Sequence, residues 1–88
     1  MNRMRLTVLS AEATILETEI EYVNLPMEFG SLGVLPGHEQ MLCKLASGIL
    51  RCRFEDGQGL RVRIGAGLCR VEDNDVTCLV DSGEILEE

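Results

Sequence analysis

Apolar and polar residues alternate with a period of two along much of the chain, which is the pattern of a half-buried β-strand. The alternation is clear over residues 4–9, 48–54 and 60–64. Residues 55–59, between the last two stretches, contain two glycines, so we expect a hairpin loop there. In these two strands the core would take Leu50, Cys52, Phe54, Val62 and Ile64. The opposite face would carry Arg51, Arg53, Arg61 and Arg63.

A second alternating hairpin is predicted over residues 67–80, with its turn at residues 72–75. Residues 25–38 contain three glycines and two prolines, which exclude a helix, and Pro36-Gly37 predicts a turn. Residues 10–22 fit a capped helix and a pair of strands equally well. Turn signals recur about every ten residues, which is typical of an antiparallel β-sandwich or barrel.

The length of 88 residues predicts one domain, residues 1–88, with a single small core. No apolar run approaches the roughly 20 residues that span a bilayer. The first eight residues alternate arginine with apolar residues and lack the apolar stretch of a signal peptide. We therefore expect a cytosolic protein.

The net charge of −7 disfavours nucleic-acid binding, which normally needs a basic surface. The chain has no Trp, one Tyr and two Phe, so it also lacks a platform for stacking bases. Five of the eight basic residues lie between Arg51 and Arg70. This segment either contributes only to solubility, meets an acidic partner, or pairs with acids of the same chain.

Four cysteines stand at positions 43, 52, 69 and 78, and none belongs to a closely spaced pair of the kind that binds structural zinc. We expect four reduced thiols without metal, with Cys52, Cys69 and Cys78 as small core residues. His38 is the only histidine, and nothing in the sequence brings a nucleophile to it. The sequence therefore predicts no catalytic site and no cofactor.

Residues 30–38, read as Gly-Ser-Leu-Gly-Val-Leu-Pro-Gly-His, resemble the signature of the epsilon subunit of F-type ATP synthase. Three further stretches match this family in the expected order, at residues 8–12, 46–51 and 65–81. The resemblance implies an all-β fold, a flattened antiparallel β-sandwich of about ten short strands, and it favours strands over residues 10–22.

The resemblance also implies a function. The family's subunit is a non-catalytic part of the central stalk, which binds the gamma subunit and the membrane-embedded c-ring and couples their rotation. It would lie at the cytoplasmic face of the bacterial membrane, peripherally, through the complex. The positions that match the family's interfaces, together with neighbouring apolar residues, are Ser10, Gly30, Ser31, Leu32, Gly33, Pro36, Gly37, His38, Glu39, Met41 and Cys43.

The chain departs from the family pattern in three places. Ser31 replaces an acid, Glu39-Gln40 replace a small residue and proline, and the sequence reaches Glu88 without the family's two C-terminal helices. Because those helices carry the family's brake on hydrolysis and its ATP site, we expect no ATP binding by these residues. Two other interpretations remain open: a free-standing β-sandwich interaction module, and a small metal-dependent enzyme.

Overall fold

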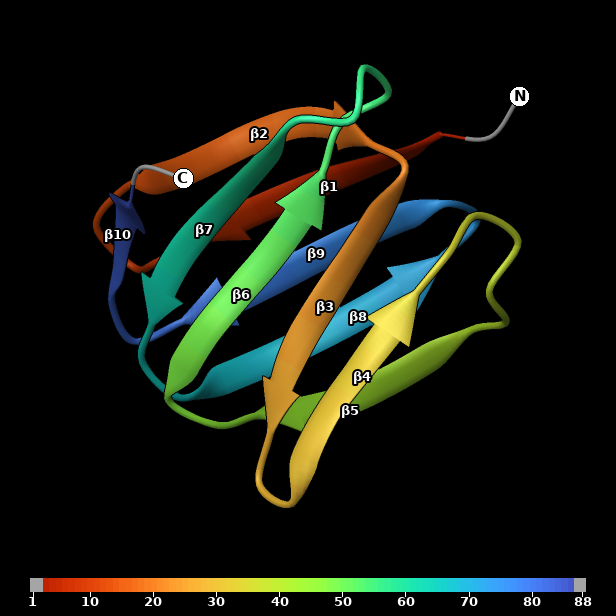
Figure 1. Cartoon of the computed structure of the whole chain (residues 1–88). Coiled ribbons are helices and arrows are strands. Elements are labelled where there is room, and N and C mark those ends of the chain that lie inside the picture. Colours follow the sequence, from red (N-terminus) through yellow and green to blue (C-terminus); the bar gives the residue numbers. More distant parts are fainter. Residues whose placement is uncertain (1–2, 87–88) are drawn as a thin grey trace.

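The computed structural model describes residues 3–86 as a sandwich of two five-stranded sheets (Figure 1). Sheet A has the order β2 (Thr14–Ile20), β1 (Met4–Leu9), β9 (Asp75–Val80), β8 (Gly67–Glu72) and β5 (Met41–Leu45). Sheet B has the order β10 (Gly83–Leu86), β7 (Gly59–Ile64), β6 (Gly48–Arg53), β3 (Tyr22–Met27) and β4 (Gly30–Val34). The predicted sandwich of about ten strands is confirmed.

The ambiguous segment forms the strand β2 and the start of β3, so its propensity for helix is overridden by pairing. β2 lies antiparallel beside β1, with Met4 opposite Ile20 and Val8 opposite Leu16. β3 pairs on both sides, with β4 and with β6. The expectation of strands from the family resemblance is confirmed here.

One pairing departs from the antiparallel pattern: β1 and β9 are parallel, from Arg5 opposite Asp75 to Leu9 opposite Leu79. All other strand pairings between residues 3 and 86 are antiparallel. The parallel pair is possible because the chain between β1 and β9 builds the rest of sheet A and four of the five strands of sheet B, and β10 follows β9. The pairing of β1 with β9 joins the β1–β2 hairpin to the β8–β9 hairpin.

The core lies between the two sheets. It consists of the inward-facing residues of the strands, which occur at every second position along a strand. Leu50 and Val62 are fully buried, and Cys52 and Ile64 are nearly so, as their alternation predicts. Phe54 packs partly buried against this core. Among the described residues no polar or charged residue is buried, so the interior offers hydrophobic packing only.

Both predicted hairpins are present. The β6–β7 loop closes through a backbone hydrogen bond of 2.8 Å from Phe54 N to Gln58 O. The β8–β9 turn is shorter than expected, because Asp73 and Asn74 alone form it, with φ of 53° and 62°. Two central residues with positive φ make a type I′ turn, whose twist matches that of the strands.

None of the elements between residues 3 and 86 is a helix long and apolar enough to cross a membrane.

Candidate functional site

The signature segment, residues 30–38, is a strand followed by a turn. Residues 30–34 form β4, and the turn follows at residues 35–38. In Figure 1 the β3–β4 connection and the β4–β5 connection lie at different ends of β4. At about 3.3 Å per residue the strand separates Gly30 from the turn by roughly 15 Å.

The turn at Pro36 and Gly37 has the predicted form. Gly37 has a φ of 86°, and His38 N donates a 3.1 Å hydrogen bond to Leu35 O. Pro at the second position and Gly with positive φ at the third describe a type II turn. Gly37 N also donates to Asn74 Oδ1 at 2.7 Å, which fixes the turn against the β8–β9 hairpin.

His38 and Glu39 follow this turn at the surface, at the end of sheet A where β9 begins. His38 is half-buried, and its Nδ1 lies 2.8 Å from Glu39 O. Glu39 is exposed. The imidazole thus contacts a backbone oxygen. In the described part of the chain, none of its hydrogen-bond partners is a nucleophilic side chain. This arrangement suits a surface contact better than acid–base chemistry.

The β4 residues of the signature differ in what they face. Ser31 is exposed, and its Oγ accepts a 3.2 Å hydrogen bond from Asn24 Nδ2. Gly33 lies beneath the ring of Tyr22, and a Cβ there would lie 2.9 Å from the Tyr22 hydroxyl. Leu32 points the other way and packs against the core. A substitution at Leu32 would therefore change stability as well as any interface.

Met41 and Cys43 on β5 also face inward, where both are half-buried and pack against the core. Their neighbours on β5, Leu42 and Lys44, face outward, and Leu42 is 72% exposed. The sequence-based choice of Met41 and Cys43 for an interface thus missed Leu42. Lys44 could have indicated the exposure of Leu42. A lysine marks the outer face of an otherwise apolar strand, and Leu42 lies on the same face, two positions before Lys44.

Ser10 lies far from His38. It follows the end of β1, where its N donates to Ala13 O at 2.9 Å and its Oγ accepts from Glu12 N at 3.3 Å. His38 is tied through Gly37 to Asn74, just before β9 begins. Because β1 and β9 are parallel, the end of one and the start of the other lie at opposite ends of sheet A. The structure does not bring Ser10 and His38 into one site.

A group of apolar side chains on the outer face of sheet A was not predicted from the sequence. Leu68 stands opposite Leu79, and Leu79 stands opposite Leu9, on three adjacent strands. Leu68 and Leu79 are 46% and 50% exposed. We call Leu9, Leu42, Leu68 and Leu79 the leucine surface. Leu9, Leu79 and Leu68 are in register, whereas Leu42 stands opposite Arg70, diagonally across from Leu68. Neighbouring exposed apolar side chains of this kind are typical of a docking face.

The tip of the β3–β4 hairpin carries Phe29, which is 95% exposed. Beside it, Glu28, Lys44, Leu45 and Ala46 line a shallow hollow. Lys44 stands opposite Leu68, so the hairpin tip adjoins the leucine surface. A Phe at a hairpin tip cannot pack on its own sheet, and it therefore presents a hydrophobic side chain for a partner.

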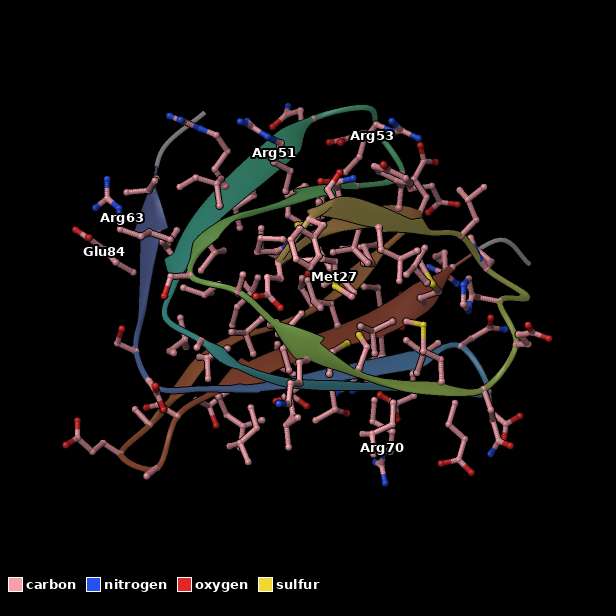
Figure 2. All side chains as sticks on the ribbon, turned by 90° about the horizontal axis from the view of Figure 1, so that it is seen from below. Met27, Arg51, Arg53, Arg63, Arg70 and Glu84 are labelled. Carbon is pink, nitrogen blue, oxygen red and sulfur yellow. The ribbon has the colours of Figure 1, made fainter. Side chains whose placement is uncertain are left out.

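The outer face of sheet B carries arginines, and two of them are paired with acids of the same chain. Arg53 Nε lies 2.9 Å from Glu21 Oε1 and its guanidinium lies 5.0 Å from the Tyr22 ring centroid. Arg63 Nη1 lies 2.9 Å from Glu84 Oε1. Figure 2 shows Arg51 and Arg53 on this face and Arg70 on the opposite side of the sandwich. Of the alternatives from sequence, pairing within the chain accounts for these two arginines.

The sequence from residue 3 to residue 85 matches the family "ATP synthase, Delta/Epsilon chain, beta-sandwich domain". The chain belongs to this family. An ATP synthase epsilon chain from Prochlorococcus marinus is 34% identical over 82 residues, which are 93% of this chain and 60% of that protein.

Two solved structures share the fold of this family member. A chain from "Cryo-EM structure of Euglena gracilis mitochondrial ATP synthase, OSCP/F1/c-ring in rotational state 1" matches with a TM-score of 0.88 and 27% identity, over 94% of this chain and 53% of that one. A chain from the Tetrahymena thermophila mitochondrial ATP synthase "central stalk/cring" structure has a TM-score of 0.76 and 19% identity, over 92% and 65%. The domain spans roughly half to two thirds of these relatives.

Proposed function

We propose that this domain is a non-catalytic part of the central stalk of an F-type ATP synthase. In this proposal the leucine surface binds the gamma subunit, and the β3–β4 hairpin tip contacts the c-ring. The domain then couples ion-driven rotation of the ring to rotation of gamma. Its place is at a membrane, peripherally and through the complex, on the cytoplasmic face of a bacterial cell.

The leucine surface is the observation that carries the proposal. Burying the exposed parts of Leu42, Leu68 and Leu79 against a partner removes apolar area from water, at roughly 25 cal/mol per Å². The leucine surface lies on a rigid sheet, so binding does not require ordering a loop. Membership in the family, and the similar chain in the Euglena gracilis structure whose description names F1 and the c-ring, support gamma and the c-ring as the partners.

A non-catalytic role is supported by the chemistry of the surface. Among residues 3–86 no group of three or more His, Cys, Asp or Glu is placed to hold a metal ion. The described hydrogen bond of the His38 ring is to a backbone oxygen, and the described interior contains no buried carboxylate, histidine or lysine.

The test is a substitution on the leucine surface. Leu68→Ser should weaken binding of the isolated domain to purified gamma roughly tenfold or more, because a central apolar contact is lost. Its melting temperature should stay close to that of the wild type, since Leu68 is about half exposed. Binding is measured by calorimetry and folding by thermal melting on the same samples.

Ile85→Ser is the matched control, because Ile85 is also 46% exposed but belongs to β10 in sheet B. It should leave gamma binding unchanged. Equal affinities of Leu68→Ser and wild type would remove the leucine surface from the interface. If the wild-type domain fails to bind gamma at all, the alternative of a free-standing interaction module gains support instead.

A further inference from the structure

Three of the four cysteines stand in one row across sheet A. Cys43 on β5 is opposite Cys69 on β8, and Cys69 is opposite Cys78 on β9. The Cys69 and Cys78 sulfur atoms are 3.7 Å apart, and the three cysteines of the row form no disulfide. Cys52 belongs to the other sheet, on β6 of sheet B.

The geometry of the β8–β9 hairpin suits a bond between Cys69 and Cys78. In a hairpin with a two-residue turn, the pair that closes the turn, here Glu72 and Asp75, is hydrogen-bonded. Hydrogen-bonded and non-hydrogen-bonded pairs then alternate, so Cys69 and Cys78 form a non-hydrogen-bonded pair with Cα atoms about 4.5 Å apart. Disulfides span Cα distances of about 4.4–6.8 Å, so the backbone can remain in place.

Access to the row differs along it. Cys69 and Cys78 are fully buried, whereas Cys43 on the edge strand β5 is half-buried. Burial and contact with the Cys69 thiol raise the pKa of Cys43. A hydrogen bond with Cys78 and burial raise the pKa of Cys69 further. A water-soluble oxidant therefore meets Cys43 first, and the inner two thiols are shielded from direct attack.

We propose that the row Cys43–Cys69–Cys78 is a thiol relay, in which a small-molecule disulfide reacts at Cys43 and the oxidation ends as a buried Cys69–Cys78 disulfide. The three sulfurs follow one another in the order in which the exchange steps require them. This proposal concerns the chain by itself and does not depend on binding to gamma or to a ring.

The steps balance as ordinary thiol–disulfide exchange, with oxidised glutathione as the oxidant. The Cys43 thiolate attacks one glutathione sulfur, a mixed disulfide forms, and the first reduced glutathione leaves with the proton. Cys69 then attacks the Cys43 sulfur and passes its proton to the second glutathione, which leaves as a thiol. Finally Cys78 attacks the Cys69 sulfur and passes its proton to the Cys43 sulfur, so that Cys43 is regenerated as a thiol. Two protein thiols are oxidised, and one glutathione disulfide is reduced to two thiols.

The experiment incubates the full chain with excess oxidised glutathione, traps free thiols by alkylation after unfolding, and maps the products by mass spectrometry. Four free thiols should fall to two, with Cys69 and Cys78 joined and no glutathione retained. The melting temperature should rise, because the new bond closes a loop in the unfolded chain. Dithiothreitol should restore four thiols.

Two variants decide whether the relay operates. Cys43→Ser, with Cys43→Ala as a second version in case serine disturbs the fold, should form the same disulfide roughly tenfold more slowly. Cys52→Ser is the matched control and should react at the wild-type rate, because Cys52 is outside the row. Glutathione left on Cys43 as the end product, a different pairing, or equal rates with and without Cys43 would each overturn the proposal.

Discussion

The Cys69 side chain shows how strongly the fold changes the properties of a single residue. It is fully buried between the sheets, beside the thiols of Cys43 and Cys78. The hydrogen bond with Cys78, followed by burial, raises the pKa of Cys69 far above its ordinary value. The folded protein therefore holds this proton at pH values at which the unfolded chain releases it.

This difference predicts a loss of stability at alkaline pH. Below about pH 8.5 Cys69 is protonated in both states, so its contribution does not change with pH. Above that value the unfolded chain loses the proton and the folded state keeps it, so stability falls, by up to about 1.4 kcal/mol per pH unit. Urea unfolding between pH 7 and pH 10 measures the slope.

The wild type is compared with Cys69→Ala, because this variant lacks the Cys69 thiol and keeps every other side chain of the chain. Its stability should fall less steeply above pH 8.5 than that of the wild type. The same slope in both proteins would show that Cys69 does not carry the effect.

At the residue scale the sequence predicted burial well and register poorly. Cys52, Cys69 and Cys78 were predicted as core residues from alternation alone, and they are buried. The alignment of Cys43 with Cys69 was not predicted, because it depends on how β5 pairs with β8 across 26 positions of chain. Spacing along a sequence does not specify pairing between distant strands.

At the scale of elements, Gly67 shows how closely two strands approach at the start of β8. A Cβ on Gly67 would collide with the Leu79 carbonyl oxygen and would lie 2.8 Å from Val80 Cα. Both are backbone atoms of the neighbouring strand β9, so they cannot move as a flexible side chain would. Only glycine fits between them.

Gly67→Ala should therefore destabilise the domain by about 2–3 kcal/mol, because a methyl group must displace the β9 backbone. Ala66→Gly, on the adjacent exposed residue, is the control and should cost no more than about 1 kcal/mol. Chemical denaturation of both variants measures the difference. A Gly67→Ala domain as stable as Ala66→Gly would show that the strands can separate more easily than this packing implies.

The signature segment shows why element boundaries were harder to predict than turns. The turn at Pro36-Gly37 was predicted because those two residues restrict the backbone directly. The strand over residues 30–34 was missed because glycines are unfavourable in strands on propensity. Its pairing with β3, where the ring of Tyr22 lies over Gly33, compensates for that. Residues 10–22 became strands for the same reason, because tertiary pairing decided between two equal propensities.

At the scale of the whole molecule, the two outer faces of the sandwich differ in chemistry. Sheet A presents the leucine surface beside charged residues, which include Arg70 and the Arg5–Glu17 pair. Sheet B presents mainly arginines, of which Arg53 pairs with Glu21 and Arg63 pairs with Glu84. Exposed ion pairs contribute little to affinity or stability. The sequence indicated the arginine face through alternation, but the leucine surface requires four strands to be placed in register.

A substitution of Phe29 tests the proposed contact of the hairpin tip with the c-ring separately from the proposed contact of the leucine surface with gamma. Phe29→Ser should leave folding and gamma binding unchanged, because the side chain is almost fully exposed and lies on the hairpin rather than on the leucine surface. In reconstituted ATP synthase it should lower ATP-driven ion pumping relative to ATP hydrolysis. Wild-type coupling with Phe29→Ser would show that the hairpin tip does not contact the ring productively.

The parallel pair of β1 and β9 also determines when the fold can be completed during synthesis. β1 is among the first strands made, and its partner β9 extends to Val80. Until those residues leave the ribosome, the β1–β2 hairpin has an open edge where β9 will pair, and a two-stranded hairpin alone is at best marginally stable. The domain should therefore fold cooperatively only after β9 has left the ribosome, and at the slower rates typical of sheets built from distant pairings.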